Sequence, residues 1–244
     1  MNSGLYAACA GLRAKTQALE LLANNLANLG TSGFKAQQPT FRSVLAQATQ
    51  TVLSPLNTAV NNYGVLSGAR LDLTSGNLEQ TGSAYDMGIE GSGFFSVQTA
   101  NGVLYTRNGS FQLSAKNQLV TQRGDVVLGE QGPLTLPRGK LSVSPDGSVS
   151  VEGALVGKLR LTEFAPGAQV SSLGAGYYAA EAKQTMRAVM SYVRQGTLEA
   201  ANVSPITATV NLITLQRHAE MLGRAVASFY SEFNRIAAGD LPRI

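Results

Sequence analysis

The chain has 244 residues, enough for one large domain or two small ones around a buried core. Charged residues make up only 14% of it, which suggests that other molecules cover much of its surface. The net charge of +4 comes from scattered lysines and arginines, without a basic run or interleaved aromatic residues. The composition therefore argues against a nucleic-acid-binding protein.

A single cysteine, Cys9, excludes an intramolecular disulfide, and no cysteines and histidines are spaced as zinc ligands, so we expect no metal and no cofactor. The N-terminal sequence lacks the basic and apolar regions of a cleavable signal peptide. No stretch approaches the roughly 18 apolar residues of a membrane span. We expect no membrane insertion, and either a cytoplasmic protein or one that leaves the cell without a cleaved signal.

Residues 1–34 predict an N-terminal helix that ends in a turn. Leucines recur at steps of seven, with two more three positions later, a pattern typical of a helix that packs along one narrow stripe. These are Leu5, Leu12, Leu19, Leu22, Leu26 and Leu29. Ser3 is an acceptable N-cap, and Gly30 and Gly33, with two hydroxyl residues between them, end the helix.

Residues 35–70 show no clear period. Phe41, Val44 and Leu45 fit a short helix, whereas the polar and β-branched sequence around Pro55 fits an extended loop. We expect an extended or partly helical linker that becomes ordered on contact with neighbouring molecules.

Residues 71–196 combine turn signals with short apolar runs, which predicts a β-rich domain. Asn101-Gly102 separates two such runs and predicts a hairpin, as does Asp146-Gly147. Around Leu159, apolar residues alternate with basic ones, as in a strand with one wet face. We therefore expect an antiparallel sandwich or barrel-like sheet.

Residues 197–244 return to a helical pattern. Asn202 or Ser204 can cap the helix, and Pro205 suits its first turn. Apolar residues then alternate at steps of four and three, again forming a narrow stripe that needs a partner. These are Ala208, Leu212, Leu215, Ala219, Leu222, Val226, Phe229, Phe233 and Ile236.

The two stripes predict an α+β fold in which the N- and C-terminal helices pair as a coiled coil and a central antiparallel β domain lies between them in sequence. Its expected parts are an N-terminal axial helix, a linker, a β-rich outer domain and a C-terminal axial helix, at residues 1–34, 35–70, 71–196 and 197–244. A chain built in this way is suited to stacking, so we expect assembly rather than catalysis.

Motifs along nearly the whole chain resemble those of the flagellar rod and hook axial proteins, and they occur in the family's order. They cover residues 22–28, 30–35, 86–89, 91–97, 105–111, 119–121 and 198–203, with Gln216, Arg217 and Glu220. The ordered set is far more specific than any single motif.

The resemblance implies a structural subunit of the bacterial flagellar basal-body rod. The short chain and residues 127–134 are most similar to the proximal rod type, with the distal rod or hook-type paralogue as the alternative. The family implies a hollow, torque-transmitting drive shaft that crosses the periplasm, with subunits exported through the flagellar secretion channel. Expected partners are copies of itself and adjacent rod proteins, with the surrounding ring bushing as a further candidate.

The expected assembly interface combines the two stripes with three asparagines. Carboxamides are unfavourable inside a helix, so the asparagines either hydrogen-bond across subunits near the channel wall or form a solvated helix end. Arg217 and Arg224 either pair with Glu20 or with an acid on another subunit, or they face solvent. The interface set is Leu5, Leu12, Leu19, Leu22, Asn24, Asn25, Leu26, Asn28, Leu212, Leu215, Leu222, Val226, Phe229 and Phe233.

Nothing in the sequence favours an enzyme, and we expect no catalytic residues. Gly88, Gly91 and Gly93 lack the spacing of a dinucleotide-binding loop and lead into a predicted strand. His218, the only histidine, has no nucleophile motif to pair with, and the acidic residues form no convergent pair. A secreted β-rich fibre or adhesin module is the second class considered, and a hydrolase is the third.

Overall fold

The computed structural model describes residues 2–45, 62–188 and 190–239 of the chain. The chain forms two compact units, which we call the helical unit and the β unit. The helical unit contains residues 1–26, 37–70 and 204–244, and the β unit contains residues 27–36 and 71–203. Each unit is thus assembled from segments that are far apart in sequence.

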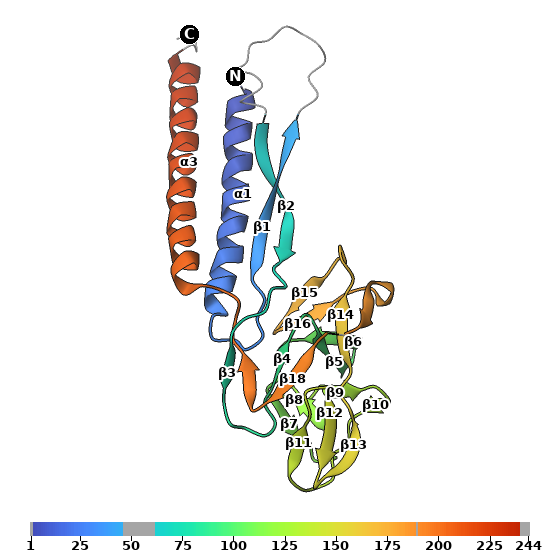
Figure 1. Cartoon of the computed structure of the whole chain (residues 1–244). Coiled ribbons are helices and arrows are strands. Elements are labelled where there is room, and N and C mark those ends of the chain that lie inside the picture. The colour runs from blue at the N-terminus through green and yellow to red at the C-terminus, as the bar shows by residue number, and fades with distance from the viewer. Residues whose placement is uncertain (1, 46–61, 189, 240–244) are drawn as a thin grey trace. The chain divides into compact units, whose positions relative to one another are not determined.

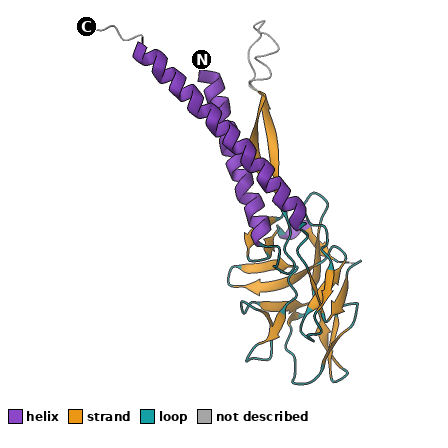
Figure 2. Ribbon diagram, turned by 90° about the vertical axis from the view of Figure 1, so that its left-hand side faces the viewer, coloured by secondary structure: helices purple, strands orange, loops and turns teal. Residues whose placement is uncertain are grey.

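Two long helices, α1 (Asn2–Ala27) and α3 (Pro205–Gly239), dominate the helical unit. They lie side by side in Figure 1 and cross in Figure 2. At one contact, a Cβ added to Gly11 would lie 3.7 Å from Cδ1 of Leu222, an ordinary van der Waals distance, so the two helices meet at this position. The predicted α+β fold with contacting terminal helices is confirmed.

The start of α3 is capped as the sequence suggested. The Ser204 hydroxyl accepts the backbone N–H of Thr207 at 3.4 Å, and Pro205 occupies the first helical position, where its missing N–H costs nothing. Ser204 rather than Asn202 is therefore the N-cap. Within the described residues, no helix has the length and apolar character needed to span a bilayer.

A two-stranded sheet completes the helical unit. Its strands are β1 (Gln37–Leu45) and β2 (Asn62–Leu71), and the Thr40 hydroxyl donates a hydrogen bond across them to the Gly68 carbonyl at 2.9 Å. The described residues of the expected linker are thus extended and paired, and none of them is helical. Residues 46–61, including the sequence around Pro55, lie outside the described residues.

The β unit is built from short antiparallel strands arranged in several sheets (Figure 1). The largest sheet has ten strands and is centred on β5, which pairs with β6, β9 and β14. The other sheets are β11-β12-β13, β18-β4 and β19-β3. In chain order the strands are β3 (Leu78–Gln80), β4 (Met87–Glu90), β5 (Phe94–Thr99), β6 (Gly102–Thr106), β7 (Phe111–Leu113), β8 (Leu119–Thr121), β9 (Val126–Gly129), β10 (Gly132–Pro133), β11 (Leu141–Val143), β12 (Ser148–Val151), β13 (Ala154–Lys158), β14 (Leu161–Phe164), β15 (Ser171–Gly174), β16 (Tyr177–Ala179), β17 (Thr185–Arg187), β18 (Tyr192–Gln195) and β19 (Thr197–Glu199).

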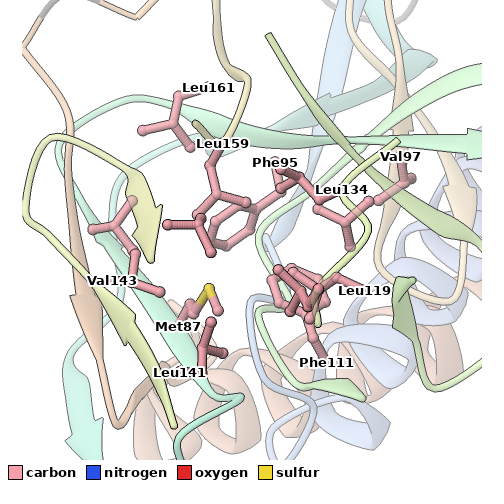
Figure 3. Close-up of a cluster of buried hydrophobic side chains, with 14 of the residues drawn as sticks. Met87, Phe95, Val97, Phe111, Leu119, Leu134, Leu141, Val143, Leu159 and Leu161 are labelled. Carbon is pink, nitrogen blue, oxygen red and sulfur yellow. The ribbon is translucent and has the colours of Figure 1, made fainter. Parts of the chain in front are cut away.

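The main core of the β unit is a cluster of buried apolar side chains contributed by most of these strands (Figure 3), and Phe94, Tyr105 and Tyr178 form a second, smaller cluster. The rings of Phe95 and Phe111 meet edge to face, with centroids 5.0 Å apart, a favoured aromatic geometry. The predicted hairpin turn between β5 and β6 is present, and Gly102 has a φ of +111° there, which suits glycine. Every buried residue of the main cluster belongs to the β unit.

Candidate functional site

On α1, the predicted stripe lies beside the most deeply buried positions. Leu12, Leu19, Leu22 and Leu26 are half-buried, whereas Ala14 and Ala18 are fully buried. The side chain of Leu5 lies outside the described residues. The most deeply buried apolar positions of α1 are thus alanines, which a search for leucine steps alone missed.

On α3, the predicted stripe faces inward along most of its length. Ala208 is buried, and Leu212, Leu215, Leu222 and Val226 are half-buried among exposed neighbours. Phe229, nearer the end of the helix, is exposed, and the side chain of Phe233 lies outside the described residues.

A second apolar stripe runs along the opposite side of α3. Ile206, Val210 and Ile213 follow one another at steps of four and three, and they are 79%, 56% and 47% exposed. We call these three residues the outer stripe. The spacing of the outer stripe is present in the sequence, but the predicted stripe on the other side of α3 is longer and gives the stronger pattern.

The three asparagines of α1 and the turn after it have different environments. Asn25 is buried, and its side chain donates to the Gln37 carbonyl at 2.8 Å and accepts the Gln37 N–H at 2.9 Å. Both polar atoms of this amide are thus used within the same chain, to hold the start of β1. Asn28 accepts the Thr31 hydroxyl at 3.1 Å in the turn, and Asn24 is exposed.

Three charged residues from distant parts of the chain meet inside the β unit. Lys35 follows the turn after α1, Arg107 follows β6, and Glu199 ends β19. Lys35 Nζ donates to Glu199 Oε1 at 2.6 Å, and Arg107 Nη1 donates to Glu199 Oε2 at 2.8 Å. All three side chains are at most 1% exposed. We call this cluster the ionic junction.

Backbone groups supply further hydrogen bonds to the junction, and Arg107 Nε is its one buried nitrogen without a partner among the described residues. Lys35 Nζ also donates to the Thr74 carbonyl at 2.6 Å, and Arg107 Nη2 donates to the Gly91 carbonyl at 2.5 Å. The Gly76 N–H donates to Glu199 Oε1 at 2.8 Å. Such partners are needed because buried charges are costly unless they are paired and hydrogen-bonded.

The charges of the junction do not cancel. Two cations share one carboxylate, which leaves a net charge of +1 on these three side chains, although Asp72 also favours the charged form of Lys35 and Glu163 that of Arg107. Burial lowers the pKa of Lys35, Glu199 opposes that shift, and Arg107 adds to it. Burial likewise lowers the pKa of Arg107, and Glu199 again opposes the shift. The Arg107 guanidinium also lies 4.8 Å from the ring centroid of Phe94, whose π face favours a cation.

Asn202 joins the segment after α1 to the segment before α3. Its side chain accepts the Ala36 N–H at 2.7 Å, and its own N–H donates to the Phe34 carbonyl at 3.3 Å. Its amide nitrogen donates to the carbonyls of Asp72 and Thr74 at 2.8 and 3.0 Å. One asparagine thus connects three backbone segments.

Gly33 fits against the junction because it has no side chain. Its φ is +69°, and an added Cβ would overlap the backbone of Arg107. Its N–H donates to the Glu199 carbonyl at 2.6 Å, and two residues later the Lys35 N–H donates to the Tyr178 hydroxyl at 2.9 Å. The turn is therefore specified by backbone geometry as well as by charge.

The remaining candidates show no catalytic arrangement. The Gly91 carbonyl accepts a hydrogen bond from Arg107, Gly88 lies within β4, and His218 is exposed on α3. Among the described residues, no three His, Cys, Asp or Glu side chains are grouped closely enough to hold a metal ion. The junction binds the chain to itself, and its chemistry is structural.

An α+β chain with exposed apolar helix surface and with its two ends tied together defines a class of assembling structural subunits. Three family descriptions match it: flagella basal body rod protein at residues 5–35, flagellar hook protein FlgE/F/G D1 domain at residues 88–151, and flagellar basal body rod FlgEFG protein C-terminal at residues 194–227. Each matched segment supplies one residue of the ionic junction.

Curated relatives match over nearly their whole length. The chain is 32% identical over 250 residues to the flagellar basal-body rod protein FlgF of Caulobacter vibrioides, with all of both chains covered. It is 31% identical to FlgF of Salmonella typhimurium and 29% identical to FlgG of Borreliella burgdorferi, in each case over 93% of this chain and 94% of the relative.

The chain belongs to the flagellar basal-body rod family of FlgE, FlgF and FlgG proteins. It is a structural subunit of the flagellar rod and not an enzyme, as the sequence predicted. Family membership also removes the support for a secreted adhesin module or a hydrolase. The ionic junction was missed because its residues lie in three motifs whose spacing in sequence does not reveal that they meet.

Proposed function

We propose that this chain is a proximal rod subunit that polymerises through its terminal helices into a hollow, torque-transmitting drive shaft. The observation that carries the proposal is the outer stripe of α3. Contiguous exposed apolar surface marks interaction sites. Burying the exposed part of each of its three side chains contributes about 1–2 kcal/mol of favourable free energy. A neighbouring subunit that packs on the outer stripe therefore gains binding free energy from all three.

In this proposal, residues 1–34 and 197–244 form the axial part of the subunit, and residues 71–196 form the outer domain. Partners are copies of the same chain and adjacent rod proteins, with either the surrounding ring bushing or an adjacent rod subunit as a contact for residues 46–70. Head-to-tail addition that does not close generates a helical tube instead of a ring. The shaft crosses the periplasm, and its subunits travel through the flagellar secretion channel.

The proximal assignment is supported by the shortness of the chain and by residues 127–134. Relatives named FlgF and FlgG match at similar identity, so identity alone does not separate the proximal type from the distal rod or hook-type paralogue. Imaging rods from cells that lack this gene distinguishes them. Loss of the whole rod beyond its base supports the proximal type, and loss of the outer end alone supports the distal type.

The polymerisation proposal is tested with Val210→Asp in the outer stripe, produced as the cell's only copy of this subunit. We expect the variant to fold but to be absent from isolated basal bodies, because a carboxylate in the centre of an apolar contact is costly to bury. Gln216→Asp, at an exposed position of the same helix outside both stripes, is the matched control and should enter rods normally. Normal incorporation of Val210→Asp would refute the proposal.

A further inference from the structure

The ionic junction contains one anion and two cations, and each comes from a different segment of the chain. Lys35 belongs to residues 33–36, which we call the N-terminal latch, and Glu199 belongs to residues 199–202, the C-terminal latch. Arg107 belongs to the body of the β unit. The single negative charge is thus supplied by the C-terminal latch alone, and this makes the contributions of the two latches unequal.

Without Glu199, the N-terminal latch would bring the Lys35 ammonium into an interior that already holds the Arg107 guanidinium. Both side chains are fully buried, and Arg107 already acts against the charged form of Lys35. Removing one partner of a buried ion pair leaves an uncompensated charge, which is strongly destabilising. The N-terminal latch also needs Asn202, which accepts the Ala36 N–H.

Without Lys35, the junction remains balanced. Arg107 Nη1 still pairs with Glu199 Oε2, and the Gly76 N–H still donates to Oε1. The C-terminal latch also keeps bonds that do not involve the N-terminal latch: β19 pairs with β3, and the Ala200 N–H donates to the Asn77 carbonyl at 2.8 Å. Glu199 can therefore be seated while the N-terminal latch is undocked.

We propose that the ionic junction is a one-way latch, in which residues 33–36 dock onto the β unit only after Glu199 is in place, whereas Glu199 docks without them. The N-terminal latch is synthesised first but must wait for residue 199. Because residues 27–32 connect it directly to α1, the anchoring of the N-terminal helix depends on the C-terminal end of the chain. A truncated chain that lacks Glu199 would leave its N-terminal latch undocked.

The test is hydrogen exchange of the full-length chain, measured for residues 31–36 and for residues 197–202. Three variants are compared with the wild type: Glu199→Gln, Lys35→Met and the double variant. Glu90→Gln is the control, since Glu90 forms an ion pair with Arg194 that is more than half exposed. We expect Glu199→Gln to speed exchange of residues 31–36 roughly 100-fold or more, as loss of a buried counter-charge implies.

We expect Lys35→Met to leave exchange of residues 197–202 within about threefold of the wild type, because its loss leaves a neutral ion pair. The double variant should recover much of the protection of residues 31–36, since it removes Lys35, the stranded cation that the N-terminal latch itself carries, while Arg107 in the body of the β unit is equally unpaired in both variants. Independent structural damage would instead make the double variant worse than Glu199→Gln.

Three results would overturn the latch: unchanged exchange of residues 31–36 in Glu199→Gln, equal loosening of residues 197–202 in Lys35→Met, or a double variant without recovery. If Glu199→Gln yields no soluble protein, solubility becomes the readout. A double variant that is more soluble than Glu199→Gln then supports the latch, and one that is no more soluble refutes it.

Discussion

Replacing Gly33 with alanine should destabilise the β unit far more than the same change at a glycine of similar backbone conformation. Gly33 has a φ of +69°, and a Cβ there would overlap the Arg107 backbone. Gly82 has a φ of +75°, but the space around its Cβ position is open. Gly82→Ala therefore measures the backbone strain alone, and the difference between the two variants measures the close approach at Gly33.

The left-handed backbone costs an alanine about 1 kcal/mol at either position. At Gly33 the turn must also move to relieve the overlap, which breaks its hydrogen bond to the Glu199 carbonyl and the bond from the Lys35 N–H to Tyr178. Breaking a buried hydrogen bond and leaving its groups unpaired costs about 1–3 kcal/mol. We therefore expect a loss of about 4 kcal/mol for Gly33→Ala and of about 1 kcal/mol for Gly82→Ala.

Urea unfolding followed by tyrosine fluorescence measures both losses, since the chain has eight tyrosines and no tryptophan. With a denaturant slope of about 2 kcal/mol per molar, the midpoint should fall by about 2 M for Gly33→Ala and by about 0.5 M for Gly82→Ala. Equal midpoint shifts would refute the reasoning, because they would show that the contact between Gly33 and Arg107 adds nothing to the backbone strain.

Two further predictions concern Asn25 and the buried tyrosines. Asn25→Ala should cost about 2 kcal/mol and speed amide exchange at Gln37, because both Gln37 backbone groups lose their partner, whereas Asn24→Ala at the exposed neighbouring position should not. Burial raises the pKa of both Tyr177 and Tyr178 to about 12. Since these pKa values lie above the unfolded value near 10, the stability they contribute is complete below pH 10 and is lost as pH rises toward 12. Absorbance titration at 295 nm should show two late-ionising groups, one fewer in Tyr178→Phe; ionisation of all tyrosines near pH 10 in the folded protein would contradict this.

The terminal helices were predictable because their apolar steps are local and repeat over many turns. The steps at Leu212, Leu215 and Leu222 correctly identified the inward side of α3. The hairpin turns were predictable for the same reason, since Asn101-Gly102 specifies its turn within a few residues. A local sequence pattern is sufficient to predict an element whose conformation is determined by a short stretch of the chain.

The sheet of β1 and β2 was missed because its signals conflict. Pro39 lies inside β1, where proline argues against a strand, and residues 46–61 separate the two strands in the sequence, so no short hairpin motif announces them. The ionic junction was missed for another reason: Lys35 and Glu199 are separated by 164 positions, and no local pattern reports such a contact. A useful signal was available, because Lys35 and Glu199 each stand between small or apolar neighbours in their motifs, and such a charge suggests a buried partner.

The hydrogen bond between Gly33 and Glu199 also has a mechanical consequence. A pull on the two ends of the chain reaches this bond and the neighbouring ion pair before it reaches any strand between them. The 164-position stretch from Lys35 to Glu199 is therefore a side loop of the load path, shielded from tension while the junction holds. Insertions at its exposed hairpins, such as the turn at Gly153, where an added Cβ meets open space, should not weaken the tether between the ends. This makes the β unit a suitable place for tags and for evolutionary change in a part that carries force.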